Sequence, residues 1–295
     1  MRRVIGILLM VVALYLAVPR IGGFFTERRP EHPYYANLPT GTQVHAHGGG
    51  QHLMPDNTML AFTHAAEIGA HVLELDVNVT KDGEIVVLHD NTVDRTTDGS
   101  GRVVDFTVEE ILALDGAYNW RAPGAGAAEY PYRGQGVQIP LLREVFEAFP
   151  GQAINVEMKS PDARMPGLLC ELITETGREH TVLVASFIQD HLYEFRKLCP
   201  TVATSAGPAE AQTFVIMNYL GLGRLYTPAM ESFQVPMKQG SIPVVNKMLR
   251  RGLAERNVRL DVWTINDEAT MQYLLDIRAD GIITDRPDLA LSLLP

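Results

Sequence analysis

The sequence predicts an α/β fold built on a parallel sheet, and its number of strands favours a closed barrel. Short β-rich runs alternate with segments of helical apolar spacing, which is typical of βαβ units. The 295 residues fit one domain, because α/β barrels reach this length without a second domain. An open sheet could carry as many strands. The eight expected strands are 43–47, 72–78, 84–89, 153–158, 181–186, 201–205, 259–265 and 281–284.

The segments between most of these strands have the spacing of amphipathic helices, as in 58–69 and 245–257. Two stretches depart from the alternation. Residues 91–140 form a long, Gly- and turn-rich excursion, and 224–241 forms a second insertion before the seventh expected strand. Long insertions on a barrel are usually functional loops.

The N-terminus predicts an uncleaved membrane anchor. An uncharged apolar run at 4–18 follows two arginines, which is long for a signal-peptide core and slightly short for a span. A cleaved signal peptide is the alternative. We expect an anchor helix over 1–25, a polar, proline-interrupted linker over 26–40 and the barrel domain over 41–295. A single-pass anchor favours a barrel outside the cytoplasm, periplasmic in a bacterium, although charges on both sides of the run leave its orientation open.

The composition excludes one class of partner. The net charge of −10 provides no basic surplus to neutralise phosphates, so the chain is not a general nucleic-acid binder. No feature indicates a protein partner. The two cysteines, Cys170 and Cys199, could pair or stay reduced.

Carboxylates stand near the ends of two expected strands, where barrels carry their catalytic groups. Glu74 and Asp76 are two apart and therefore share one face of a strand. Such a pair repels unless a cation or a proton lies between them. With Glu157 they offer three hard oxygen donors, which suit Ca²⁺ or Mg²⁺ better than zinc. A salt-bridged rim of the barrel would explain the same pattern.

Two histidines and a lysine also stand at strand ends. His89 alone would be read as a hydrogen-bonded structural residue, but with His47 at a neighbouring strand end the two could divide acid and base roles. Lys159 shares a face with Glu157. It could neutralise an anionic substrate or pair with Glu157.

Seven segments together resemble the glycerophosphodiester phosphodiesterase family, whose pattern runs His-Arg-Gly, Pro-Glu-Asn-Thr, Glu-x-Asp, His-Asp and Glu-x-Lys. The resemblance covers roughly residues 43–293. It is closest to the membrane-anchored lysophospholipase D-type members, through 139–159, 231–237 and the N-terminal apolar run. The seven segments read AHGG, PDNT, LELDV, VVLHDNTVDRTTDG, VEMK, VWTIND and DGIITDRP.

The resemblance implies a (β/α)₈ TIM barrel that hydrolyses lysophospholipids to lysophosphatidic acid and a head-group alcohol, or glycerophosphodiesters to glycerol 3-phosphate and an alcohol. It implies a Ca²⁺ or Mg²⁺ ion and leaves open whether water or a substrate hydroxyl is the nucleophile. The implied roles are metal binding for Glu74, Asp76 and Glu157, acid–base catalysis for His47 and His89, phosphate-charge stabilisation for Lys159, and substrate contact for Arg95 and Trp263.

Two positions depart from the family pattern. Gly48 stands where the family has arginine, and Asp56 stands where it has glutamate. The arginine would supply a forked contact to phosphate, so another group must supply that charge or binding is weakened. A non-catalytic, membrane-anchored binding protein on a decayed barrel is the alternative that this departure motivates.

A second alternative is an amidohydrolase-like barrel, in which the His-x-His pair of His45 and His47 binds metal with Asp285. Such sites need further histidines at later strand ends. His180 precedes its expected strand and His191 lies in a helical pattern. We therefore expect His45 to be an interior residue with a structural role.

Overall fold

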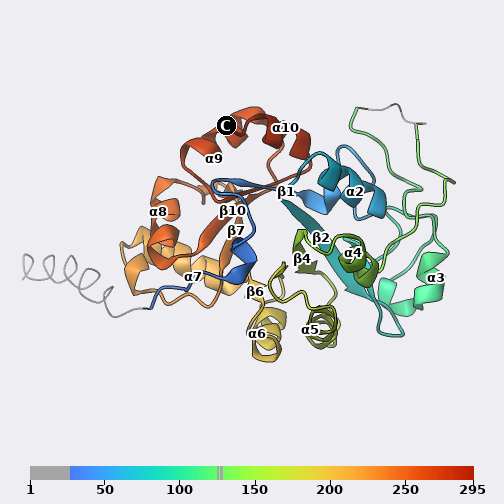
Figure 1. Cartoon of the computed structure of the whole chain (residues 1–295), viewed down its shortest axis with the longest axis horizontal. Coiled ribbons are helices and arrows are strands. Elements are labelled where there is room, and N and C mark those ends of the chain that lie inside the picture. The colour runs from blue at the N-terminus through green and yellow to red at the C-terminus, as the bar shows by residue number, and fades with distance from the viewer. Residues whose placement is uncertain (1–26, 125, 127–128) are drawn as a thin grey trace, which may run out of the picture.

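The computed structural model describes residues 27–124, 126 and 129–295, and these form a nearly closed parallel barrel surrounded by helices (Figure 1). The strands follow the order β6-β5-β4-β2-β1-β11-β10-β7. A parallel bridge between Ser205 and Ser232 then joins the end of β6 to the start of β7. The barrel strands are β1 (Gln43–Ala46), β2 (Val72–Val79), β4 (Ala153–Met158), β5 (Val182–Ala185), β6 (Ala203–Thr204), β7 (Ser232–Pro236), β10 (Arg259–Trp263) and β11 (Gly281–Thr284). The predicted barrel is confirmed.

One of the eight predicted strands forms, but it does not belong to the barrel. The run at 84–89 forms β3 (Ile85–Val87), which pairs antiparallel with the far end of β2. Its place in the barrel is taken by β7, which lies inside the predicted insertion 224–241. Periodicity could not separate the two. Residues 84–89 have the continuous apolar run of a buried strand, whereas β7 is interrupted by Gln234 and ends in Pro236.

Helices cover the outside of the barrel and bury their apolar faces against the strands (Figure 1). Several start where the sequence offers a cap. The side chains of Thr58, Asn246 and Asp267 each accept a backbone N–H bond of the first turn. The covering helices are α2 (Met59–Glu67), α4 (Leu142–Ala148), α5 (Met165–Glu175), α6 (Gln189–Leu198), α7 (Pro208–Tyr219), α8 (Lys247–Arg256), α9 (Glu268–Asp276) and α10 (Pro287–Ser292).

The excursion after β3 has a small core of its own. Val93, Val103 and Ile111 pack there with Val86 of β3. The segment carries a 3₁₀ turn (Val103–Asp105) and the short helix α3 (Val108–Leu112). The excursion is therefore a packed subdomain on β3, which we call its annex.

The interior of the barrel contains polar side chains, whereas its outer surface is apolar. His45, Asn155 and Asp261 are buried on β1, β4 and β10, and Ser232 donates to Asp261 Oδ2 at 2.5 Å. At the amino-terminal end of the strands, Tyr34 packs on Leu183 and Ala203. Tyr34 therefore covers part of this end of the barrel.

The predicted anchor, 1–25, lies outside the described residues. Within 27–295, apart from the gaps named above, no helix has the length and apolar character to cross a membrane. The part of the predicted linker 26–40 that is described packs against the barrel. Arg29 N–H donates to Arg256 O at 3.0 Å, and its guanidinium pairs with Glu231.

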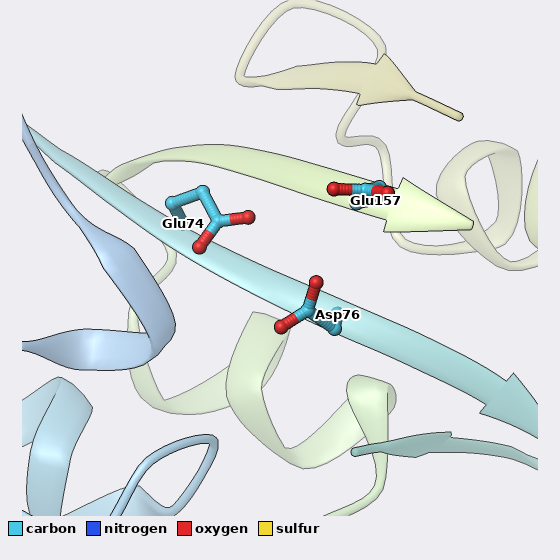
Figure 2. Close-up of side chains that lie close together, drawn as sticks. All are labelled: Glu74, Asp76 and Glu157. Atoms are coloured by element: carbon cyan, nitrogen blue, oxygen red, sulfur yellow. The ribbon is translucent and has the colours of Figure 1, made fainter. Parts of the chain in front are cut away.

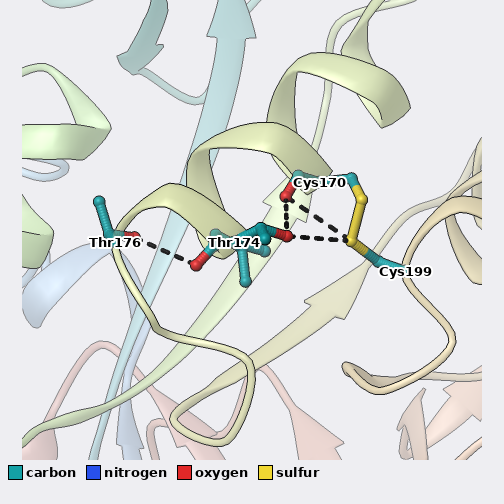
Figure 3. Close-up of a disulfide and its surroundings, with 5 residues drawn as sticks. Cys170, Thr174, Thr176 and Cys199 are labelled. Atoms are coloured by element: carbon teal, nitrogen blue, oxygen red, sulfur yellow. Dashed lines mark hydrogen bonds between the residues drawn. A yellow bond between two sulfur atoms is a disulfide. The ribbon is translucent and has the colours of Figure 1, made fainter.

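The two cysteines are joined. Cys170 of α5 and Cys199, the residue after α6, form a disulfide with 5.8 Å between their Cα atoms (Figure 3). The bond settles the alternative that the sequence left open.

Candidate active site

Three carboxylates converge on two neighbouring strands, β2 and β4 (Figure 2). Glu74 and Asp76 lie on β2, and Asp76 is in register with Glu157 on β4. Their ligand oxygens all lie within 4.8 Å of one another. Glu74 is 3 % exposed and Asp76 is fully buried. The strand pairing therefore gathers the three predicted metal ligands at one point.

The carboxylate cluster is electrostatically strained. Burial, with repulsion by Asp76, raises the pKa of Glu74 to about 8. Burial also raises the pKa of Glu157, although Lys159 opposes the shift. Lys159 Nζ lies 2.8 Å from Glu157 Oε1 and 3.3 Å from Asp76 Oδ1. One ammonium thus faces three carboxyl groups, and the raised pKa of two of them means that the site lacks positive charge to keep all three ionised.

The donor set fits a divalent cation. Asp76 Oδ1 and Glu157 Oε1 are buried without a well-directed hydrogen bond. Buried carboxylate oxygens left in this state are costly. Three hard oxygens at one point suit Ca²⁺ or Mg²⁺, which would supply the missing positive charge.

The loops after β1 hold two of these carboxylates in place. Gly48 N–H donates to Glu74 Oε2 at 2.9 Å, and Asn57 Nδ2 donates to Asp76 Oδ2 at 3.0 Å. Asn57 N–H in turn donates to Gly48 O at 2.9 Å. Asn57 adopts φ +58°, a left-handed conformation that asparagine tolerates. The PDNT turn was visible in the sequence, but not the part that Asn57 plays in it.

His47 follows β1 and faces the carboxylates from the side. Its Nδ1 lies 2.6 Å from Asp285 Oδ1, and its Nε2 lies 4.0 Å from Glu74 Oε2. Asn266 donates to the other oxygen of Asp285 at 2.6 Å. Burial lowers the pKa of His47, but the Glu74 charge and the Asp285 bond outweigh burial and raise the pKa to about 9. Asp285 is absent from the predicted site, although its place at a strand end was the signal for it.

His89 has a matching carboxylate partner. Its Nδ1 lies 2.7 Å from Asp90 Oδ1, and Arg95 Nε donates to Asp90 Oδ2 at 2.5 Å. His89 follows β3 instead of a barrel strand, but Leu88 N–H donates to Asp76 O at 2.9 Å. That bond ties the end of β3 to the carboxylate cluster. Both predicted acid–base histidines therefore direct Nδ1 to an aspartate.

Arg95 lies beside the position where the family arginine is missing. Arg95 Nη2 donates to Asp56 Oδ2 at 2.9 Å. A Cβ atom on Gly48 would lie 3.3 Å from the Cβ of Asp56. A guanidinium from the excursion after β3 therefore binds Asp56, the residue that lies against Gly48.

Aromatic side chains border the site. Trp263 of β10 contacts Phe187 edge to face, with centroids 5.7 Å apart, and Lys159 Nζ lies 5.7 Å from the Phe187 centroid. Trp120 of the excursion donates to Gln51 O at 3.2 Å. Gln51 Nε2 in turn lies 2.7 Å from His47 Nδ1. Phe187 and Trp120 were not predicted, because their chain segments carry no motif.

The His-x-His alternative is not supported by the geometry. His45 is 3 % exposed, His180 lies on the surface and His191 lies on α6. Among the described residues, the group able to hold a metal ion through three or more side chains is Glu74, Asp76 and Glu157, without His45.

Comparisons with known proteins show which family the chain belongs to. The model of the glycerophosphoryl diester phosphodiesterase family matches residues 47–289. A glycerophosphodiester phosphodiesterase of Caldanaerobacter subterraneus subsp. tengcongensis is 35 % identical over 260 residues, covering 85 % of this chain and 97 % of that protein. Human lysophospholipase D GDPD1 is 28 % identical over 269 residues, covering 82 % of each chain.

Solved structures of low sequence identity share the fold. The glycerophosphoryl diester phosphodiesterase domain of an uncharacterised Mycobacterium tuberculosis protein has a TM-score of 0.74 at 18 % identity, covering 85 % of this chain and 98 % of that chain. An Oleispira antarctica phosphodiesterase in complex with its product sn-glycerol-3-phosphate has a TM-score of 0.68 at 24 % identity, covering 88 % and 98 %. The chain therefore belongs to the glycerophosphoryl diester phosphodiesterase family and is a phosphoric diester hydrolase.

Proposed function

We propose that the barrel hydrolyses lysophospholipids in the manner of a lysophospholipase D, with Ca²⁺ or Mg²⁺ held by Glu74, Asp76 and Glu157. The observation that carries the chemistry is the placement of two aspartate-bound histidines and a lysine around one carboxylate cluster. Each part of this arrangement has a task in cleaving a phosphodiester bond.

The histidines divide the proton transfers. A hydrogen bond from Nδ1 to an aspartate fixes the ring, so Nε2 is the atom left to exchange a proton with substrate. Asp285 does this for His47, and Asp90 does it for His89. One histidine accepts the proton of the nucleophile and the other protonates the leaving alcohol.

The charged groups bind and stabilise the phosphate. Lys159, which follows β4, and Arg95, which lies in the excursion, bring positive charge to the site. A bound divalent cation would supply a Lewis acid that polarises a phosphoryl oxygen. The nucleophile is either water or the glycerol hydroxyl of the substrate. Hydrolysis in ¹⁸O-labelled water with early quenching tells them apart, because only the second route passes through a cyclic phosphate.

Three observations favour a lysolipid over a soluble diester. The chain resembles a human lysophospholipase D over most of its length. The apolar run at 4–18 predicts an anchor. Phe187, which is 59 % exposed, extends the wall formed by Trp263 and offers an apolar surface beside the site.

The test is a substrate panel with both products identified. The full chain in detergent, supplied with Ca²⁺ or Mg²⁺, should release lysophosphatidic acid from lysophosphatidylcholine faster than glycerol 3-phosphate from glycerophosphocholine. The opposite order would refute the lysolipid assignment but not the hydrolase. His47→Ala and His89→Ala should each lower kcat by orders of magnitude with the fold retained. No turnover of any diester would instead favour the non-catalytic binding protein.

We further propose that the barrel works outside the cytoplasm, periplasmic in a bacterium, on the N-terminal anchor. The Cys170–Cys199 disulfide supports this location, because such bonds persist in oxidising compartments and are rare in the cytosol. Intact cells treated with a membrane-impermeant maleimide should label both cysteines only after reduction. No labelling of intact cells after treatment with an impermeant reductant, with labelling of both cysteines after lysis, would contradict the proposed location.

A further inference from the structure

An exposed apolar surface lies where α7, the β8–β9 hairpin (Lys238–Gln239 and Ile242–Pro243) and α8 meet. Tyr219 Oη donates to Pro243 O at 2.8 Å and accepts from Asn246 Nδ2 at 3.4 Å, so the three elements are in contact. The exposed fractions are 51 % for Ile216, 48 % for Tyr219, 51 % for Leu220, 60 % for Ile242 and 45 % for Met248. We call these five side chains the α7–α8 face.

The chain around this face is almost free of acidic residues. Between residues 211 and 254 the single acidic residue is Glu231, in a chain that contains 35. Glu231 is buried and pairs with Arg29. The same segment carries five basic residues. Arg224 and Arg251 pair with Glu255, and Arg250 pairs with Asp280, so the unpaired positive charge at the face comes from Lys238 and Lys247.

Two lysines at the face are free to meet an anionic partner. Lys238 lies in the hairpin beside Ile242, and Lys247 lies next to Met248. Both are exposed, and neither side-chain ammonium has an ion-pair or hydrogen-bond partner within the described part of the chain. Apolar side chains beside unpaired lysines are the combination that binds an anionic lipid surface.

The face is also placed for such contact. The hairpin follows β7, whose last residue, Pro236, is in register with Trp263 of β10, so the hairpin lies at the carboxyl end of the barrel strands. Arg28 donates to Ala254 O and Arg29 to Arg256 O, both in α8. Arg28 and Arg29 therefore lie against the carboxyl-terminal end of α8.

We propose that the α7–α8 face docks on the surface of a bilayer that contains anionic lipid. A second copy of the chain fits the face less well, because a two-fold contact would bring like charges of Lys238 and Lys247 together. The docking does not depend on the proposed lysophospholipid specificity. It would hold the opening of the barrel beside the bilayer.

The test uses the full chain with an environment-sensitive fluorophore on Ile242→Cys, since both native cysteines are in the disulfide. Leu60→Cys is the matched control, because Leu60 is 42 % exposed on α2, across the barrel in Figure 1. Vesicles of phosphatidylcholine and phosphatidylglycerol, with brominated chains, should quench the label at 242 several-fold more than at 60. Vesicles of phosphatidylcholine alone should quench both weakly.

A charge reversal separates docking from catalysis. Lys238→Glu with Lys247→Glu should reduce quenching at 242 to the level of the control and leave hydrolysis of soluble glycerophosphocholine unchanged. Equal quenching at 242 and 60 in the anionic vesicles, or no effect of the charge reversal, would overturn the proposal. A doubled molecular mass in light scattering that is lost on Ile242→Asp would assign the face to a second copy instead.

Discussion

At the scale of single residues, Asp285 is the informative member of the site. It binds the imidazole of His47 on one side and is itself held by Asn266 on the other. This chain of bonds fixes both the position and the charge preference of the histidine. The function of His47 therefore depends on an aspartate 238 residues away in sequence.

The first prediction removes the charge of Asp285 and keeps its shape. Asp285→Asn should lower kcat on the order of a hundredfold, because His47 loses its orienting partner and the charge that favours its protonated form. KM should change much less. Asp288→Asn is the matched control, since Asp288 pairs with Arg286 outside the site. Equal losses in both variants would indicate a general effect of lost charge.

The second prediction concerns His45. Burial, followed by repulsion from His71, lowers the pKa of His45 to about 3. The folded protein therefore keeps it neutral while the unfolded chain takes up a proton below its ordinary value, 6.5. The stabilisation by neutral His45 is complete above that value and is lost as the pH falls towards 3, by up to about 1.4 kcal/mol per pH unit.

Urea unfolding at several pH values tests this. His45→Gln should be less stable than the parent at neutral pH but should show a smaller loss of stability between pH ~6.5 and pH ~4. The same substitution at the exposed His180 should leave the slope unchanged. An unchanged slope in His45→Gln would mean that other groups set the acid sensitivity. Asp261 would not be among these groups, because burial raises its pKa to about 6 and so favours the folded state as the pH falls.

Residue spacing predicted part of the site and could not predict the rest. Glu74 and Asp76 alternate on one strand, so their shared face follows from the pleat alone. The bond from Asn57 to Asp76 depends on a left-handed turn, and the bond from Asp285 to His47 depends on strand order around the barrel. Neither hydrogen bond can be predicted from the spacing of residues along the sequence. The family motifs, not the spacing, assigned a role to Arg95 and Trp263.

At the scale of elements, the turn after β1 is packed so closely on α2 that glycine is required. A Cβ atom on Gly49 would lie 2.6 Å from the Cβ of Ala61, and the residue has φ +81°. A Cβ on Gly41 would meet nothing within 4 Å, although its φ is +98°. Both glycines have a positive φ that disfavours other residues, but only at Gly49 would an added Cβ atom collide with a neighbouring residue.

The third prediction uses this pair. Gly49→Ala should lower the free energy of unfolding by about 1–3 kcal/mol more than Gly41→Ala, because α2 must move away. It should also lower activity, since the same turn carries His47 and the Gly48 N–H bond to Glu74. Equal loss of unfolding free energy in the two variants, measured by urea titration, would show that α2 can move away without destabilising the fold.

The exchange of β3 and β7 shows what element patterns can and cannot predict. An apolar run reports burial, and β3 is buried under its annex as deeply as a barrel strand. The barrel position of β7 depends on partners at both edges, Ser205 on one side and β10 on the other. A single sequence carries no record of those partners.

At the scale of the whole molecule, the barrel is closed unevenly. β2 and β4 pair over six residues, whereas β5 and β6 pair over two and β6 meets β7 at one bridge. The fourth prediction is that amides of β6 exchange hydrogen for deuterium before those of β2 and β4. Mass spectrometry of peptides covering 203–205 and 153–158 measures this. Equal protection would mean that side-chain packing, not strand pairing, closes the seam.

The fifth prediction concerns the cation and stability. A site that exists only in the folded chain stabilises it by mass action, about 2.7 kcal/mol at a ligand concentration near one hundred times Kd. Ca²⁺ or Mg²⁺ should therefore raise Tm, and a chelator should reverse the change. Glu74→Gln should remove most of the effect, while Glu84→Gln, outside the cluster, should keep it. The same rise in both variants would place the ion elsewhere.

The disulfide has one more consequence for this fold. The chain between Cys170 and Cys199 contains β5 and α6, and its exposed part includes Phe187 at the mouth of the barrel. If a protease cleaves there, the two fragments stay covalently joined and cannot diffuse apart. The nicked enzyme would migrate as one band on a gel without reductant and as two bands with it. The disulfide thus keeps β5 and α6 attached to the rest of the barrel after a single proteolytic cleavage.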